Sequence, residues 1–566
     1  MVTTPTTVDW AAECEAIWQA TLDREREYQQ IRKQDQLIRI WDGDYNLKHV
    51  ITDFYSTDFN PLDGDTGTHE IVLPWEDPCA QWAFDEERRI ANGEKQIINV
   101  TCDYVGARIS GRLQQLTVDT DEWGRQRVTM TFEDDYETLK GYDVWSNPFL
   151  PAAFQFPRVF ILPGPLRWVL KTTLFLQVLR EQTNLWSLPD DPLNLGSYAS
   201  GFDMSNWMVL IKPTLLLEDL AAGSIWGVAC SRWKNFHDMQ KPMTEDAEYS
   251  WKLRRWLKGD PVPDWCQALG FEPAHGALIV DLVDESGTYV GTSHGGTMFD
   301  GLFRTIGDFT EDFLETDYVA LMDDEIPEAY KQANPLARFT RKERPFVVYS
   351  PDMPGVKSMQ YLYKPAKFIQ INTGGHSMPG VNEAISAGIQ ALGDIIGNQL
   401  QIGSIGGSVD TLLKPFYEDT VLAWMSVKLL MRSMKQGKSR LFEYFQEGAD
   451  KAYTISAMMV MRTGVWATRT IRQDTIQITD GGPWLLGDQG VGHYWLSSRV
   501  GAMVPGDTRK QIYMDRVRAL KLHQERGQRP RFDITVGDNT ADEDPATAAW
   551  GRIESLISSV KDLGVF

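Results

Sequence analysis

A run of short alternating segments between residues 36 and 136 constrains this fold more than any other feature of the sequence. Residues 37–41 alternate, Asp42-Gly43-Asp44 forms a turn signal, and residues 45–52 return, which is the pattern of a β-hairpin. Further strand patterns follow at 70–73, 97–104, 108–119 and 127–133. Because few helix starts interrupt them, we predict a compact antiparallel barrel or sandwich in this region.

A second strand-rich region closes the chain. Strand patterns occur at 475–479, 494–498, 511–522 and 531–536, and a helix is predicted after Asp544-Pro545. The residues between the two β-rich regions predict a buried helix at 166–180, a helix at about 244–258, a strand at 278–283, and long helices at about 417–436 and 439–463. The middle of the chain is therefore predicted to be mixed α/β, followed by helical segments.

Residues 9–33 predict an amphipathic helix ahead of the first β-rich region. Its apolar residues repeat at spacings of three and four, opposite a charged run at 23–27, and they are Trp10, Cys14, Ile17, Trp18 and Leu22. No neighbouring segment of the sequence supplies a surface against which to bury them. We expect this helix to be an arm that docks onto the body or onto another subunit.

These patterns predict an α+β fold with two antiparallel β domains separated by mixed α/β and helical insertions. A chain of this length exceeds what one hydrophobic core supports. The predicted divisions are a helical arm at 1–35, a first β domain at 36–146, a mixed α/β insertion at 147–345, a Gly-rich and helical region at 346–470, and part of a second β domain with a C-terminal helix at 471–566.

Two compositional features point to interfaces. The chain has 20 tryptophans, which suit buried cores or subunit contacts, a sugar-binding platform being the alternative. Residues 380–413 are rich in glycine, and each glycine lowers helix stability by roughly 1 kcal/mol. We expect this segment to be a packed interface element, an ordinary surface loop being the alternative. The predicted interface residues are Trp10, Trp18, Gly388, Gly393 and Gly397.

The sequence carries none of the common enzymatic motifs. It has no phosphate-binding glycine loop, no nucleophile elbow and no H-E-x-x-H, and its eight histidines are far apart. An acidic loop from Asp58 to Asp65 superficially resembles a calcium-binding loop, but Leu62 and His69 fall where ligands are required. Carboxylate pairs such as Asp134-Asp135 are too numerous for any one to be singled out. We predict no catalytic residue, no cofactor and no metal.

The charge and the cysteines exclude other classes. With 56 basic and 78 acidic side chains the net charge is −22, which argues against a nucleic-acid-binding protein. The N-terminus lacks the basic and apolar regions of a signal peptide, and no apolar stretch approaches the roughly 20 residues of a membrane-spanning helix. The five cysteines contain no C-x-x-C motif and are predicted to be core residues in a reducing compartment.

Several segments resemble siphophage tail-hub proteins, the minor tail proteins of actinobacterial phages. The similar segments are residues 37–85, VTMTFEDDYETLKGYDVWSNPFLP at 128–151, RRWLKGDPVPDW at 254–265, TGGHSMPGVNEAIS at 373–386, LLKPFYEDTVLAW at 412–424 and EGADKAYTISAMMVMRTGVW at 447–466. Their order extends over more than 500 residues. One departure is Ser497-Ser498-Arg499-Val500-Gly501, where the family carries a G-D-x-V turn.

The resemblance implies a structural protein of the virion tail tip. It implies two barrels of the tail-tube type in one chain and a homotrimer, so that three chains offer six near-equivalent surfaces to a six-fold tube. Implied partners are the distal tail protein ring, the tape measure protein, other minor tail proteins and, indirectly, the host envelope. DNA would pass through the channel without specific binding. The negative charge then has two readings, repulsion of phosphate in a channel or simple solubility.

Two other functions stay open from the sequence. The first is a tail-associated hydrolase of the cell wall, which would need a close carboxylate pair or a histidine-bound metal in a concave site. The second is a receptor- or glycan-binding tip protein, which would need exposed, clustered tryptophans.

Overall fold

The structure is a computed structural model, and its described residues cover most of the chain. They are 10–285 apart from gaps at 121–123, 190, 195, 197–200 and 222–223, together with 319–320, 347–374, 424–445, 464–465, 468, 470–478, 484–508 and 512–537.

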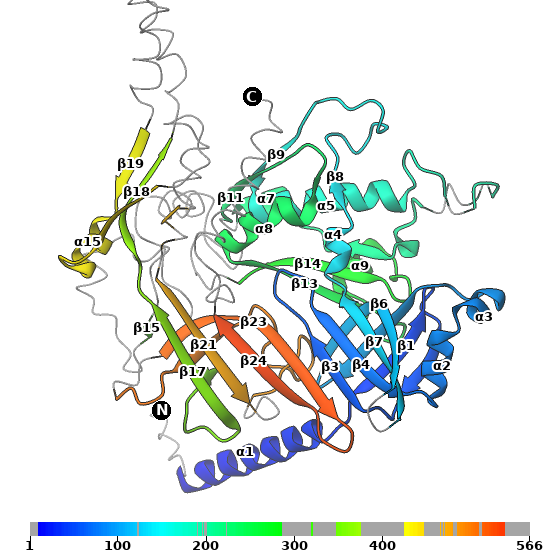
Figure 1. Ribbon diagram of the computed structural model, residues 1–566, viewed down its shortest axis with the longest axis horizontal. Coiled ribbons are helices and arrows are strands. Elements are labelled where there is room, and N and C mark those ends of the chain that lie inside the picture. The colour runs from blue at the N-terminus through cyan, green and yellow to red at the C-terminus, as the bar shows by residue number, and fades with distance from the viewer. Residues whose placement is uncertain are drawn as a thin grey trace, which may run out of the picture.

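A 14-stranded sheet formed by the described residues organises the molecule (Figure 1). Its N-terminal strands are β1 (Leu37–Asp42), β2 (Leu47–Ile51), β3 (Ser56–Asn60), β4 (Thr68–Pro74), β5 (Ile98–Tyr104), β6 (Ala107–Thr120) and β7 (Gln126–Asp134). Its later strands are β15 (Val319–Ala320), β16 (Val348–Tyr349), β17 (Val356–Lys364), β21 (Ile471–Ile478), β22 (Arg499–Met503), β23 (Ile512–Glu525) and β24 (Arg531–Gly537). The main order is β17-β21-β24-β23-β3-β4-β7-β6-β5-β1-β2.

The two β-rich regions of the sequence meet within this sheet. Strand β23 pairs antiparallel with β3, and the register runs from Leu522 opposite Phe59 to Glu525 opposite Ser56. One hydrophobic core follows the sheet across this junction, because Phe59 and Ile71 belong to the same buried cluster as Leu520 and Ile534. The described strands therefore form one sheet with a shared core.

A mixed α/β lobe lies beside the large sheet (Figure 1). Its helices are α4 (Glu137–Lys140), α5 (Leu166–Gln182), α7 (Leu216–Ala221), α8 (Phe236–Ala247) and α9 (Asp264–Leu269), with a short 3₁₀ turn, η1 (Met204–Asn206). Its strands are β8 (Asp143–Val144), β9 (Phe160–Pro165), β10 (Val209–Ile211), β11 (Trp226–Ser231), β12 (Lys234–Asn235), β13 (Tyr249–Arg255) and β14 (Leu278–Asp284). The β10-β14-β13 sheet and helix α5 enclose a second core, which includes Leu170, Leu210 and Val280.

A third, smaller unit stands apart from both (Figure 1). Strand β18 (Phe368–Gly374) lies between β19 (Trp424–Lys428), which is antiparallel to it, and β20 (Leu441–Phe445), which is parallel. Helix α15 (Leu430–Gln436) lies between β19 and β20 in the chain. The buried Arg432 of this helix donates to the Phe368 carbonyl at 2.9 Å and to the Thr468 hydroxyl at 2.8 Å. We call this unit the β18–β20 module.

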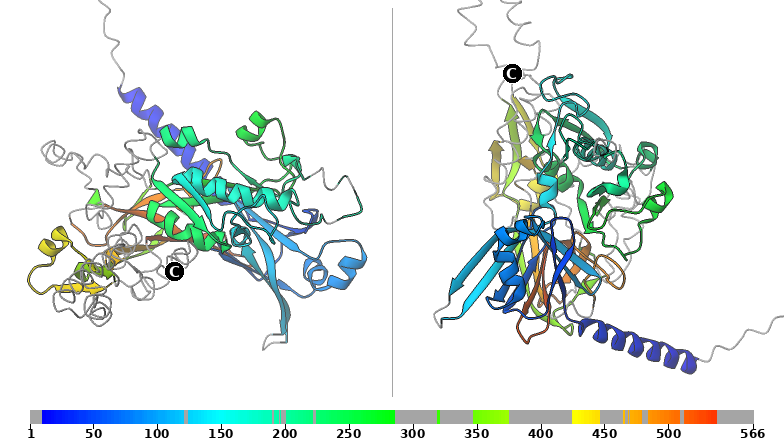
Figure 2. Two further views of the ribbon diagram at one scale, coloured as in Figure 1. Left: turned by 90° about the horizontal axis from the view of Figure 1, so that it is seen from above. Right: turned by 90° about the vertical axis from the view of Figure 1, so that its right-hand side faces the viewer.

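The N-terminal helix α1 (Trp10–Arg32) contains no buried residue. Figure 2 shows it leaving the body as a straight arm. Two short helices, α2 (Pro78–Phe84) and α3 (Glu86–Ala91), lie at the β2 end of the sheet instead. There the His49 ring of β2 lies 5.4 Å from the Trp82 ring of α2, so that this sheet edge is covered by side chains.

Most sequence-predicted elements are confirmed within the described residues. The predicted hairpin, the strands β4 to β7, the buried helix α5, and the strands β14, β21, β23 and β24 are all present within a few residues of the expected bounds, whereas β3, which pairs with β23, was not predicted. The α+β content and the antiparallel sheet agree with the prediction. The predicted C-terminal helix and residues 380–413 lie outside the described residues.

Four local predictions are wrong, wholly or in part. The expected helix at 244–258 ends at Ala247, because Glu248 takes a left-handed conformation with φ of 57° and Tyr249–Arg255 pairs with β14 as β13. Strands β19 and β20 replace parts of the long helices expected at 417–436 and 439–463. The strand expected at 494–498 is largely a turn, in which the Ser498 amide donates to the Trp495 carbonyl at 3.1 Å.

Candidate functional site

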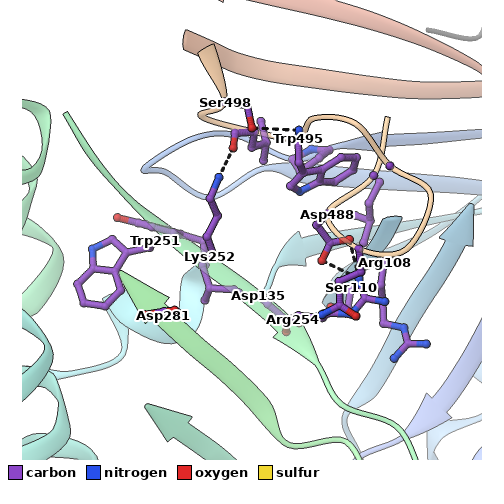
Figure 3. A pocket seen from close by; sticks show the side chains of 18 of the residues that line it. Arg108, Ser110, Asp135, Trp251, Lys252, Arg254, Asp281, Asp488, Trp495 and Ser498 are labelled. Atoms are coloured by element: carbon purple, nitrogen blue, oxygen red, sulfur yellow. Dashed lines mark hydrogen bonds and ion pairs between the residues drawn. The ribbon is translucent and has the colours of Figure 1, made fainter. Parts of the chain in front are cut away.

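The mixed α/β lobe meets the large sheet across a cleft of about 480 Å³. Strands β13 and β14 form one wall, the ends of β6 and β7 another, and the loop at 487–498 a third. Figure 3 shows Trp251 of β13 on one side and Trp495 of the loop on the other, with charged side chains between them. Polar side chains from three distant parts of the sequence therefore line the cleft.

Strand β13 supplies the cations that join the lobe to the sheet. Arg255 reaches Asp135 with both its Nε and its Nη2 atoms, at 2.9 Å and 2.6 Å, and Asp135 also accepts from Ser110. Arg254 binds Asp488 at 2.5 Å. Lys252 pairs with Glu285 at 3.0 Å and donates to the Leu496 carbonyl in the third wall. Each of these three neighbouring residues therefore contacts a different carboxylate.

Asp63 is the most deeply buried carboxylate of this boundary. Its Oδ1 accepts from Ser250 of β13 at 2.7 Å, and its Oδ2 lies 3.0 Å from Arg518 and 3.9 Å from Arg516 of β23. Burial by itself would raise the pKa of Asp63, but the two guanidinium groups and the Ser250 hydroxyl hold it below its usual value. Asp63 thus connects the loop after β3, the second β-rich region and the mixed lobe.

The rest of the acidic loop is also paired with cations. Asp65 lies 2.7 Å from Lys140 and 2.8 Å from Lys241, and these contacts outweigh its partial burial and lower the pKa of Asp65. Asp58 contacts His523 at 2.7 Å and Lys521 at 3.1 Å. The acids that superficially resembled a calcium-binding loop therefore form ion pairs with other parts of the chain.

The cleft carboxylates are arranged as structural partners. Asp134 lies 3.3 Å from His69 and accepts from the Tyr136 amide at 2.8 Å, while Asp135 is held by Arg255 and Ser110. In the described part of the chain no three His, Cys, Asp or Glu side chains gather as a metal site. Likewise, none of the described helices is both long enough and apolar enough to cross a bilayer.

The predicted interface residues fall in two groups. Trp10 and Trp18 project from α1 with 71% and 58% of their surfaces exposed, and Ile17 between them is 61% exposed. The other end of α1 is fixed to the body, because the Tyr28 hydroxyl lies 3.0 Å from His493 Nε2 and Tyr28 and Ile31 pack against the large core. Gly388, Gly393 and Gly397 lie outside the described residues.

Sequence reasoning missed the ion pairs of the cleft and the surface of the β18–β20 module. The pairs of Arg255, Arg254 and Arg518 join residues that are 120 to more than 450 positions apart, so that no local pattern could reveal them, whereas Lys252 and Glu285 are closer in sequence. The module does carry a sequence signal, a cluster of basic residues after β19 in an acidic chain.

Comparisons with known proteins agree with the resemblance seen in the sequence. The family described as "Siphovirus ReqiPepy6 Gp37-like protein" matches residues 37–538. Minor tail protein Gp28 of Mycobacterium phage L5 is 28% identical, over 93% of this chain and 94% of the relative. Minor tail protein Gp28 of Mycobacterium phage D29 is also 28% identical, with the same coverage.

Solved structures resemble the chain only distantly. A tail protein from Neisseria meningitidis MC58 aligns with a TM-score of 0.38 and 9% identity, over 91% of this chain and 99% of the other. A prophage tail protein from Listeria monocytogenes aligns with a TM-score of 0.37 and 10% identity, over 92% and 99%. The family match, which extends over most of the chain, is the decisive finding: the chain belongs to the siphophage family of ReqiPepy6 Gp37-like proteins.

Proposed function

We propose that the chain is a structural minor tail protein that forms the central hub of the phage tail tip. In this role it closes the tail channel and joins the six-fold tail to three-fold tip components during adsorption and DNA ejection. The family match and the names of the two mycobacteriophage relatives support a structural role in the tail.

The observation that carries the proposal is the pairing of β3 with β23. It brings two β-rich regions of one chain edge to edge in a single sheet with one core. We propose that these regions are two modules of the tail-tube type. A homotrimer then presents six similar modules around an axis, which matches a six-fold tube to a three-fold tip.

The charge of the chain fits a channel. A net charge of −22 on each copy repels the phosphates of passing DNA, so that DNA travels through the ring without specific binding. The proposed neighbours are the distal tail protein ring, the tape measure protein and other minor tail proteins. Gly388, Gly393 and Gly397 are proposed to pack near the three-fold axis, where small residues allow close approach of three chains.

A structural role agrees with the geometry of the cleft. A glycosidase requires one carboxyl group to stay protonated near neutral pH and a second to act on the substrate. Here Asp135 is held by the Arg255 guanidinium and the Ser110 hydroxyl, and Asp134 contacts His69 and a backbone amide, so that both carboxyl groups are already bound within the chain. No observation at the cleft favours the hydrolase over the hub.

Cryo-electron microscopy of intact virions tests the proposal directly. We expect three copies of the chain around the channel at the distal end of the tail. Six copies, one copy, or a position along the tail tube would refute it. Mass photometry of the purified chain is the complementary solution measurement, and we expect a species three times the mass of the 64.3 kDa monomer.

A further inference from the structure

The β18–β20 module has a charge opposite to that of the chain as a whole. Residues 368–374 and 424–445, which form the module, contain five basic residues and one acid, Glu443, in a protein with a net charge of −22. Arg432 is buried and donates hydrogen bonds within the module, while Lys428, Lys435, Lys438 and Arg440 are exposed. Among the described residues no carboxylate forms an ion pair with Lys428, Lys435 or Lys438.

The module also exposes apolar side chains that are close in sequence to its cations. Met434 is 70% exposed, Leu441 53% and Phe442 55%, and all three lie within the stretch that contains Lys435, Lys438 and Arg440. At the other end of the strands the Trp424 and Phe445 rings form an edge-to-face pair 5.7 Å apart, and both are about half exposed. Exposed apolar groups with cations around them are typical of a protein contact surface.

The N-terminal half of α1 has the complementary properties. Trp10, Cys14, Ile17 and Trp18 occupy one face of the helix at positions i, i+4, i+7 and i+8, and all are exposed. Residues 10–23 contain three acids, Glu13, Glu15 and Asp23, and no base. This half of the helix therefore offers an apolar stripe on an acidic segment.

The two surfaces lie apart on one molecule. In all three views of Figures 1 and 2, the α1 arm and the β18–β20 module occupy different sides of the body. The arm is fixed at its body end through Tyr28 and Ile31, and its free half extends for about 20 Å at 1.5 Å per residue. An arm anchored in this way reaches a second molecule more readily than the module of its own chain.

We propose that the acidic, apolar half of α1 docks onto the basic, apolar surface of the β18–β20 module of a second copy of this chain. The two surfaces differ, so that each contact is head-to-tail, and repetition of such contacts closes a ring. The inference rests on the proposed homotrimer and names the surfaces that hold it together. Charge complementarity selects the partner, since the arm repels anionic lipid and nucleic acid while the module attracts an acidic helix.

Cross-linking through Cys14 tests the contact in the full-length chain. Cys14 is the exposed one of the five cysteines, and Cys230, which is partly exposed, is removed as Cys230→Ser. In that background Met434→Cys is treated with a short bismaleimide. We expect covalent dimers and trimers on a denaturing gel, and we expect their loss when Cys14→Ser is added. Phe84→Cys, at a position on α2 that is 56% exposed, is the control and should give none.

Charge reversal is the second part of the test. Glu13→Lys with Glu15→Lys, or Lys435→Glu with Lys438→Glu, should each weaken association about tenfold by mass photometry, the size expected when two exposed ion pairs become repulsive. The four changes together should restore association. If the trimer forms but gives no Cys14 cross-link, and if the charge reversals do not change its association, this contact is overturned. The hub proposal is not affected by that result.

Two further outcomes are decisive. A wild-type chain that stays monomeric at every concentration overturns the trimer and this contact together. The wild-type chain could also bind anionic phosphatidylglycerol vesicles or duplex DNA. If the Lys435→Glu, Lys438→Glu variant loses that binding while the trimer persists, the module is a site for that anion and the proposed docking is overturned.

Discussion

Replacing Asp63 by alanine should destabilise the protein strongly, because this carboxylate neutralises two cations at a buried junction. Asp63 and Arg516 expose only 3% and 2% of their side chains, and Arg518 exposes 23%. Removing one member of a buried ion pair leaves a charge without its partner, which costs about 3–5 kcal/mol. The Ser250 hydroxyl loses its acceptor in the same step. We expect a loss of this size in the free energy of unfolding.

Asp53, in the loop between β2 and β3, provides an exposed control. It pairs with Arg526 at 2.6 Å, but the two side chains are 49% and 58% exposed. An exposed pair contributes about 0–1 kcal/mol, so Asp53→Ala should change stability little. Urea unfolding, followed by tryptophan fluorescence and far-ultraviolet circular dichroism, measures both variants. Equal midpoint shifts for Asp63→Ala and Asp53→Ala would refute the argument that the Asp63 junction holds the two β-rich regions together.

The pH dependence gives a second measurement on Asp63. The pKa of this carboxyl is lowered in the folded state, so its contribution is complete above the unfolded value of about 4 and is lost as the pH falls below it. Asp63→Asn keeps the shape of the side chain and removes its charge. The stability difference between wild type and Asp63→Asn should therefore be largest at neutral pH and shrink towards pH 2.

Three further predictions concern single positions and the arm. Ser497 has φ of 70° and is fully buried, and its Oγ has no hydrogen-bond partner in the described part of the chain. Ser497→Gly should therefore stabilise the protein by about 1 kcal/mol in thermal unfolding. Ser498→Gly, which removes the acceptor of the Trp495 amide, should destabilise it in the same measurement. Burial and the nearby Asp515 raise the pKa of Asp474 to about 7, so the folded state binds a proton that the unfolded state releases. The free energy of unfolding should therefore fall as the pH rises from 4 to 7. Asp474→Asn should remove this pH dependence and, in urea titrations at pH 8, should be more stable than wild type by as much as about 4 kcal/mol. Deleting residues 2–23 removes no buried side chain from the described helix and should shift the melting temperature of the monomer by less than about 2 °C, yet it should abolish trimers in mass photometry.

Local patterns were enough to predict the parts of the fold whose partners are close in sequence. Strands β1 and β2 are joined by the Asp42–Asn46 turn, in which the Asp42 side chain accepts from the Asn46 amide at 2.9 Å, and the D-G signal of this turn is visible in the sequence. Helix α5 was predicted because its apolar residues recur at helical spacing along 17 residues. In both cases the residues that determine the structure lie within a few turns or one hairpin of each other.

Strand β13 shows why other parts could not be predicted. Its sequence, Tyr249–Arg255, carries three cations in seven residues and follows a helix without a glycine or proline break. Those cations are acceptable in a half-buried strand only because Asp135, Asp488 and Glu285 approach from elsewhere in the chain. The same limit applies to the candidate site. The helix α1 was predicted from its amphipathic pattern, and the interface role of Trp10 and Trp18 stays a prediction, whereas the cleft depends on contacts between residues far apart.

The separation of the two cores determines how the molecule can respond to force. The large sheet and the mixed lobe each enclose their own apolar cluster. The boundary between them instead contains the ion pairs of Arg254, Arg255 and Asp63 and a cleft of about 480 Å³. An apolar core resists displacement because any shift opens a void, whereas a polar boundary can exchange partners with water as it opens. The mixed lobe should therefore move as a unit against the sheet. The cost of that movement is set by the buried carboxylates, above all by Asp63, which contacts both β13 and β23.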